Sequence, residues 1–439
     1  MQVDGSSRRL LVRRSRILGA ILLTMVAASQ WGMLWLAAVY LRIGRIGHML
    51  SPEAAVGLLA ILAAVATLLV FDPRIARSAP DFTGWLLAAF LLVAIFGEIA
   101  RPDLRLGNVS TFLSIGAYYL VGMSIGSMAA QRDGQLPMLR GLLAIYTIWY
   151  AGIAFFLAVG DLGFYGVLPG SGLPRLEFRE GFTATELPIY VGFQFPVLLY
   201  AMFTSNSAPT RLWAFALSLC AVALVAATVS AAAIAALVLA LLLFVLARQR
   251  SRHAAEVLLA FAFVAVPIGA AALLWAPLGG IIDSASEKLG NLFAGEGLRA
   301  RIYGELIHDI TTYPMGIGKG RFVETNNFSW LGEGVYPHHN LLGIGAELGV
   351  AAMVLFATLV VTAIVVLGRR ALGDPARHGQ RFRMLVTVAL AIFAYQQFRG
   401  LFQDTWVVRE TYLWLGLGTG AVLTRVARSA PTKSPARAQ

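Results

Sequence analysis

Apolar residues fill most of this chain in runs that are long enough to cross a lipid bilayer. A membrane-spanning helix needs roughly 20 mostly apolar residues, and about twelve segments meet this requirement. The pattern predicts an all-α, polytopic integral membrane protein with one long polar stretch, at residues 277–340. The expected spans lie near residues 17–40, 53–71, 82–99, 109–130, 138–159, 186–204, 211–228, 230–247, 254–276, 341–368, 384–402 and 405–427.

The seventh and eighth spans come from one apolar run, residues 212–246, which has hardly a break. At about 1.5 Å per residue, a single helix of this length would extend beyond the bilayer. We therefore expect two helices that are joined by a turn around Thr228-Val229-Ser230.

The composition supports a membrane protein and excludes other classes. Only 13% of the 439 residues are charged, whereas a soluble domain has about 25%. The net charge of +12 raises the question of nucleic acid, but no basic-aromatic binding module is present, so no nucleic-acid partner is expected. The single cysteine, Cys220, lies within a span and excludes a disulfide framework.

Basic residues gather in alternate loops, which predicts the orientation of the chain. Both termini are expected in the cytoplasm, and residues 277–340 face outward, which is the periplasm in a Gram-negative cell. The expected organisation is a cytoplasmic tail at 1–16, spans one to nine at 17–276, a periplasmic catalytic segment at 277–340, spans ten to twelve at 341–427, and a cytoplasmic tail at 428–439.

The spans contain few ionisable residues in this interpretation. Glu98, Glu186, Glu256 and Glu347 lie near span ends, and the most polar pair inside a span is Gln396-Gln397. A proton- or ion-coupled transporter usually has ionisable groups near the middle of the membrane. The sequence therefore favours chemistry at the outer membrane face over transport.

Three groups of residues on the outer side could carry this chemistry. They are the segment 175–182 with Arg175 and Arg179, the segment 297–303 that begins a helix reaching about Thr312, and the segment 336–340 before the tenth span. Each has an ordinary explanation alone, as interfacial anchors or incidental loop residues. Together, an arginine cluster suits a diphosphate, and a histidine suits proton removal from a hydroxyl.

The order and spacing of these residues resemble the O-antigen ligases, GT-C-like membrane glycosyltransferases in a superfamily with O-antigen polymerases and protein O-oligosaccharyltransferases. Arg299 stands four residues before Tyr303, and a turn rich in Pro and Gly follows at 314–318. His338 is then followed by a Glu nine residues on and by a Gly eleven residues on, Glu347 and Gly349.

The resemblance implies transfer of O-antigen from undecaprenyl diphosphate to lipid A-core at the periplasmic face of the bacterial inner membrane, without a metal or other cofactor. It implies that His338 is the general base and that Arg299 binds the diphosphate. The further residues expected to contact substrate are Arg179, Arg301, Arg321, His339, Tyr336 and Glu347.

One position departs from the family. A Ser-Arg pair usually begins the eighth span on the outer side, whereas Ser230 is followed here by Ala231. Either another outer arginine supplies the charge, or the chain is a weakened or engineered form. Two alternative functions stay open, a polysaccharide polymerase that uses the same donor and, less favoured, a lipid or glycan transporter.

Overall fold

The computed structural model describes the chain in blocks. These comprise residues 14, 16–30, 62–64, 67, 81–132, 134–167, 174–178, 187–228, 230–248, 298–322, 337, 339–373, 379–401 and 405–429. The span predicted near 254–276 lies outside the described residues, and the spans near 17–40 and 53–71 are described only in part.

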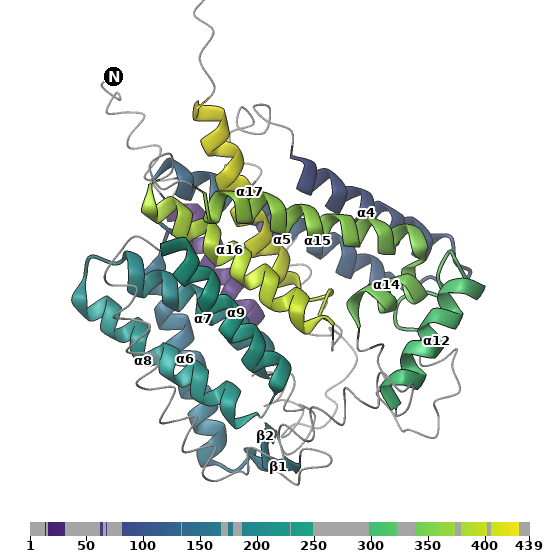
Figure 1. Cartoon of the computed structure of the whole chain (residues 1–439), viewed down its shortest axis with the longest axis horizontal. Coiled ribbons are helices and arrows are strands. Elements are labelled where there is room, and N and C mark those ends of the chain that lie inside the picture. The colour runs from purple at the N-terminus through teal and green to yellow at the C-terminus, as the bar shows by residue number, and fades with distance from the viewer. Residues whose placement is uncertain are drawn as a thin grey trace, which may run out of the picture.

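Nearly all of the described residues are helical (Figure 1). Within them, six helices are long and apolar enough to cross a membrane, and each coincides with a predicted span or with most of one. The described chain is therefore a polytopic helical membrane protein. The six are α4 (Phe82–Ile99), α5 (Leu106–Gln131), α6 (Leu139–Ala158), α7 (Leu187–Thr204), α8 (Ala208–Ala227) and α15 (Val350–Ala371).

The turn predicted between the seventh and eighth spans is confirmed. Helix α8 ends at Ala227, Thr228 caps it, and α9 (Ala231–Arg248) begins three residues later. The two helices then pack on different partners, because α8 lies mainly along α7 and α9 mainly along α16 (Gln380–Arg399).

Helices α5 and α17 (Arg409–Ser429) form the closest pair in the described bundle. A Cβ atom at Gly122 would lie 2.0 Å from the Leu413 carbonyl oxygen, and one at Gly420 would lie 2.0 Å from that of Met123. Small residues spaced four apart let two membrane helices approach until their backbones touch. The full set is Gly122 and Gly126 on α5 with Gly416 and Gly420 on α17.

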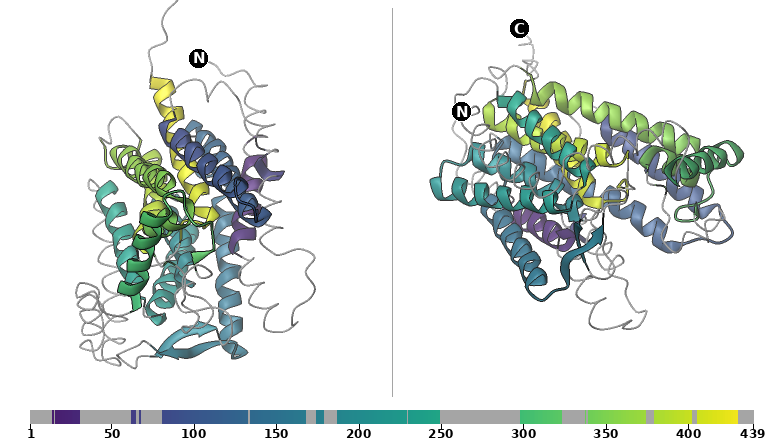
Figure 2. Two further views of the ribbon diagram at one scale, coloured as in Figure 1. Left: turned by 90° about the vertical axis from the view of Figure 1, so that its right-hand side faces the viewer. Right: turned by 60° about the horizontal axis from the view of Figure 1, so that its bottom comes forward.

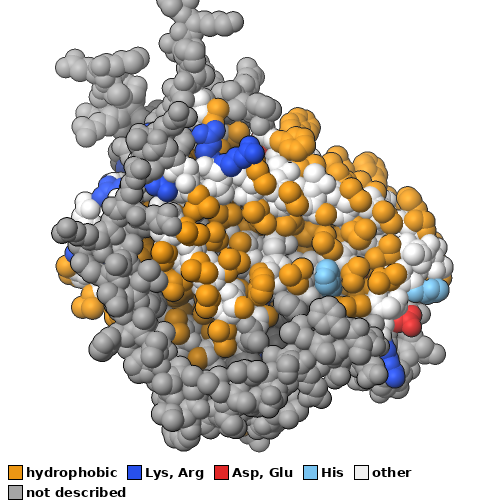
Figure 3. All heavy atoms as spheres, viewed as in Figure 1, with side chains coloured by type: hydrophobic (Ala, Val, Ile, Leu, Met, Phe, Trp, Pro, Cys, Tyr) orange, Lys and Arg blue, Asp and Glu red, His pale blue; other side chains and the backbone are white. Residues whose placement is uncertain are grey.

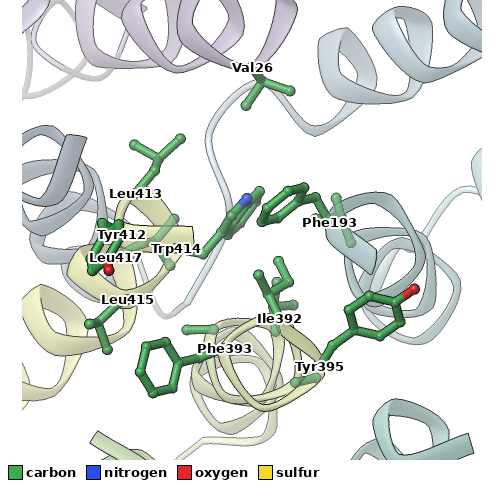
Figure 4. Packing of buried hydrophobic residues seen from close by; sticks show 14 of the residues in the cluster. Val26, Phe193, Ile392, Phe393, Tyr395, Tyr412, Leu413, Trp414, Leu415 and Leu417 are labelled. Carbon is green, nitrogen blue, oxygen red and sulfur yellow. The ribbon is translucent and has the colours of Figure 1, made fainter. Parts of the chain in front are cut away.

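Helix α16 packs between α7, α9, α15 and α17, and most of its side chains are buried. In Figure 4, Trp414 of α17 and Phe193 of α7 meet beside Ile392 of α16. Hydrophobic side chains also cover much of the described surface that Figure 3 shows, with a few Lys and Arg near its upper rim. This distribution suits a protein whose flanks face lipid.

Two buried ionisable residues lie where α16 ends and α17 begins. Arg399 is 1% exposed, and Glu410 is fully buried. The Glu410 carboxylate accepts hydrogen bonds from Ser29 Oγ at 2.8 Å and Gln30 Nε2 at 3.0 Å. Both residues lie at the ends of their helices, so the expectation that the middle of the membrane is nearly free of ionisable groups stays a prediction.

One element departs from the all-α expectation. Strands β1 (Leu162–Val167) and β2 (Pro174–Phe178) form a two-stranded antiparallel hairpin between α6 and α7. The left view of Figure 2 shows this hairpin at one end of the bundle. It contains Arg175, one of the basic residues expected on the outer side.

Candidate functional site

The tenth span is two helices rather than the single helix predicted at 341–368. Helix α14 (Asn340–Leu348) ends at Gly349, and α15 begins at Val350. Gly349 has a φ of 95°, a conformation that breaks the helix and disfavours any side chain. The break leaves carbonyl groups of α14 and N–H groups of α15 without partners in their own helices.

A second segment supplies those partners. Residues 314–320 follow α12 (Leu298–Thr312), and we call them the clasp loop. The Ile317 and Gly318 N–H groups donate to the carbonyl oxygens of Ala346 and Glu347, both at 2.8 Å, and Val350 N–H donates to Pro314 O at 3.0 Å. The clasp loop therefore satisfies both sides of the break.

The close contact between the clasp loop and the break explains why glycine occupies two positions of this region. Gly316 has a φ of 80°, and a Cβ atom there would lie 2.5 Å from the Glu347 carbonyl oxygen. A Cβ atom on Gly349 would lie 2.7 Å from Pro314 O. The turn rich in Pro and Gly and the later Gly349, which the sequence treats as separate motifs, are two halves of one interface.

Arg101 holds the clasp loop from the other side. It follows α4, and its Nη1 and Nη2 donate to Ile317 O at 2.6 Å and Gly316 O at 2.5 Å. Asn108 of α5 adds a hydrogen bond from Nδ2 to Lys319 O at 3.1 Å. The connection between α4 and α5 and the start of α5 thus hold the loop that bridges the break between α14 and α15.

Arg321, predicted to contact substrate, is engaged with acidic residues in the structure. It forms an ion pair with the Asp103 carboxylate, and its Nη2 lies 3.8 Å from Glu98 Oε1. The hydrogen bond from Arg321 lowers the pKa of Asp103. The Asp103 contact offsets the positive charge that a diphosphate would need, so this geometry favours a structural role for Arg321.

Glu347 also binds the clasp loop. Its side chain is buried, and Oε1 accepts a hydrogen bond from the Gly320 N–H at 2.9 Å. Glu347, which stands nine residues after His338 in the predicted motif, thus fixes the clasp loop.

His339 caps the start of α14. Its Nδ1 accepts from the Leu342 N–H at 3.3 Å, and its ring meets that of Tyr303 edge-on with centroids 5.6 Å apart. Partial burial lowers the pKa of His339 and favours the neutral ring that this hydrogen bond needs. Tyr303 belongs to α12, so His339 joins the two helices that carry the predicted motifs.

Asn340 is a residue of the site that sequence reasoning missed. It is 3% exposed, and its N–H donates to Gly400 O at 2.6 Å. Its Oδ1 accepts from the N–H groups of Thr405 and Trp406 at 2.8 and 3.1 Å. The only signal in the sequence is an asparagine directly after the histidine pair at the start of an apolar run.

The remaining predicted residues stand as follows. The helix expected from 297 to about Thr312 is confirmed as α12. Arg299 lies on it, but its side chain is outside the description, whereas Arg301 is exposed. His338, Arg179 and Tyr336 lie outside the described residues, and their roles stay predictions. The flanking residues Pro337 and His339 place the chain on either side of His338.

Arg175 lies beside the turn where the family has an arginine. From β2, its Nε donates to Thr228 O at 3.1 Å, and partial burial lowers the pKa of the guanidinium. Ala231 follows three residues later. Arg175 is therefore an arginine positioned near the start of α9, although the substrate contacts predicted from sequence named Arg179 instead.

This turn lies at the same end of the bundle as Gly400. Tyr395, in the last part of α16, donates its O–H to Pro188 O at 2.7 Å, which joins the end of α16 to the start of α7. Helix α8 runs back along α7, so Thr228 returns to that end. Arg175, His339 and the end of α16 thus share one end of the molecule, where cationic and imidazole groups can meet an anionic substrate.

Comparison with known proteins gives a family match for part of the chain. No curated protein matches the chain with significant similarity. Residues 213–357 match the family model described as O-antigen ligase. The matched region runs from α8 through the turn at 228–230, α12 and the clasp loop into α15, so this part of the chain is similar to an O-antigen ligase domain.

Proposed function

We propose that this protein transfers O-antigen polysaccharide from undecaprenyl diphosphate to lipid A-core at the periplasmic face of the inner membrane. The observation that carries the proposal is the match to the O-antigen ligase family over residues 213–357. That region includes Arg299, His338 and the clasp loop, which are the residues and turn of the predicted motifs.

In the proposed mechanism, His338 accepts the proton of a sugar hydroxyl on lipid A-core. The oxygen attacks the anomeric carbon of the donor, the bond to the diphosphate breaks, and the configuration at that carbon is inverted. Undecaprenyl diphosphate leaves with the bonding electron pair. A diphosphate is already a good leaving group, so the mechanism assigns no residue as an acid.

Arginines at the outer end stabilise the leaving diphosphate through charge-assisted hydrogen bonds. Arg299 is the first candidate, with Arg301 on the same helix and Arg179 in the connection after β2. Arg175 joins this set because of its contact with the turn before α9. Arg321 leaves this set because it is paired with Asp103, and Glu347 is no longer assigned to substrate because it holds the clasp loop.

Purified protein in lipid nanodiscs tests the proposal directly. We expect it to join carrier-linked polysaccharide to lipid A-core with a metal chelator present, and we expect His338→Ala to abolish the product. His308→Ala is a matched control, since His308 is exposed on α12 and has no assigned role. Transfer that requires an added divalent ion would contradict the proposed mechanism.

A polymerase that uses the same donor would behave differently. In a strain lacking the protein, the proposal expects long polymer on the carrier lipid and none on lipid A-core. Single repeats on the carrier would instead identify a polymerase. Normal capped lipopolysaccharide in a strain that carries only the His338→Ala variant would refute the role of His338 as base.

A further inference from the structure

Arg101 stands outside both the predicted motifs and the family match, yet it makes two short hydrogen bonds to the clasp loop. The acceptors are the carbonyl oxygens of Gly316 and Ile317. The next N–H groups along the loop, on Ile317 and Gly318, point the other way and donate to α14. The clasp loop is therefore held between Arg101 and the end of α14.

We propose that Arg101 is a positioning residue for glycosyl transfer. By fixing the clasp loop it fixes the C-terminal end of α14, and the other end of this nine-residue helix directly follows His338 and His339. This inference rests on the proposed function, in which His338 is the base. It adds a residue between the third and fourth spans to the parts on which the reaction depends.

The chemistry of the contact requires arginine. A planar guanidinium can donate to two neighbouring carbonyl groups at once, whereas a lysine ammonium is a point charge on a flexible stem. A Cβ atom on Gly318 would lie 3.2 Å from Arg101 Nη1, so the loop backbone passes close to the guanidinium. Glycine at position 318 thus leaves room for the Arg101 guanidinium beside the loop backbone.

The charges around Arg101 favour a structural contact over a phosphate site. Burial and the nearby Arg321 lower the pKa of the Arg101 guanidinium, and the nearby carboxylates of Glu98 and Asp103 partly oppose this shift. Glu98 is itself buried and accepts from Asn108 Nδ2 at 2.9 Å. The guanidinium groups of Arg101 and Arg321 therefore both lie close to carboxylates, which weakens their attraction for an anion.

Two variants and a matched control test the inference. Arg101→Gln removes the paired donors, and Arg101→Lys keeps the charge. Arg383→Gln is the control, because Arg383 Nε also donates to a carbonyl group at a helix end, that of Ala371, at 3.1 Å and away from the clasp loop. Amide hydrogen exchange would be followed in peptides that contain Ile317, Gly318 and Val350, with α5 peptides reporting on the bundle.

In Arg101→Gln, we expect exchange at those three amides to become about tenfold faster or more, because charged hydrogen bonds are lost. The turnover number should fall about tenfold, while the KM for the donor stays within about twofold. Arg101→Lys should recover part of both losses. Arg383→Gln should leave clasp-loop exchange and turnover near those of the wild type.

Unchanged exchange in Arg101→Gln would overturn the inference, and so would a rise in donor KM that accounts for the whole loss of activity. The second result would make Arg101 a substrate contact. The proposed function fails separately, if the wild-type protein transfers no glycan to lipid A-core. The exchange measurement then still decides whether Arg101 holds the loop.

Discussion

Asn340 and Thr405 hydrogen-bond to each other in both directions at one end of the bundle. The Thr405 N–H donates to Asn340 Oδ1 at 2.8 Å, and Asn340 Nδ2 donates to Thr405 Oγ1 at 3.1 Å. The backbone N–H of Asn340 also donates to Gly400 O. The start of the broken tenth span is thereby joined to the connection between the last two helices.

Replacing Asn340 by alanine should destabilise the protein by roughly 2–4 kcal/mol, because it leaves buried N–H groups of Thr405 and Trp406 without an acceptor. Asn340→Asp keeps the acceptor and should cost less. Unfolding in a denaturing detergent series would measure both. Asn206→Ala is the control, since the hydrogen bond of Asn206 to Arg381 is exposed and should contribute little. Equal losses in Asn340→Ala and Asn206→Ala would contradict this account.

Hydropathy predicted six of the described helices well, because a helix in lipid must be apolar over most of its length. It also placed the turn at 228–230 correctly. It missed the break at Gly349, because the hydropathy of an apolar run does not change when a glycine interrupts the helix. Nor does it show whether another segment hydrogen-bonds the backbone groups beside that glycine. The partner that does so, the clasp loop, comes about thirty residues earlier in the chain.

The site was predicted less completely for a related reason. Spacing places Glu347 and His339 near His338, but it does not separate a side chain that meets substrate from one that supports the backbone. Both residues make backbone contacts in the structure. Hydropathy equally failed to identify Glu410, because a composition count does not show which hydroxyl and amide groups of other helices will surround a carboxylate.

The clasp interface makes Gly349 sensitive to any side chain. Gly349→Ala should destabilise the protein by about 1–3 kcal/mol through the unfavourable φ alone, and the contact with Pro314 O adds to this. Gly368→Ala on α15 is a suitable comparison, because nothing lies within 4 Å of its added Cβ. That change should be neutral or stabilising by up to about 1 kcal/mol. A similar effect of both substitutions on unfolding would count against the strained break.

His339 should make stability depend on pH. Its pKa in the folded protein is below the ordinary value of 6.5, because burial disfavours the charged ring. The stability from the neutral ring is therefore complete above about pH 6.5 and is lost as the pH falls below that value toward the folded-state pKa. His339→Asn keeps a capping side chain that does not titrate. The difference in melting temperature between wild type and variant should shift in favour of the variant between pH 7 and 5, and a constant difference would rule out this role.

Arg175 provides the most direct test of whether another arginine replaces the one that is expected where this chain has Ala231. If its guanidinium supplies positive charge near the start of α9, Arg175→Gln should lower the rate of transfer to lipid A-core roughly tenfold or more. A second substitution, Ala231→Arg, should then restore much of that rate, since it puts a guanidinium on the same helix end.

A purely structural Arg175 predicts another result. Its Nε holds Thr228 O at 3.1 Å, and an arginine at 231 does not replace that hydrogen bond, so the double variant would stay as slow as Arg175→Gln. Initial rates with purified proteins separate the two cases, and the KM for the donor adds a second readout. If Arg175 supplies positive charge, the KM for the donor should rise in Arg175→Gln. It should fall again in the double variant, because the diphosphate regains a positively charged partner.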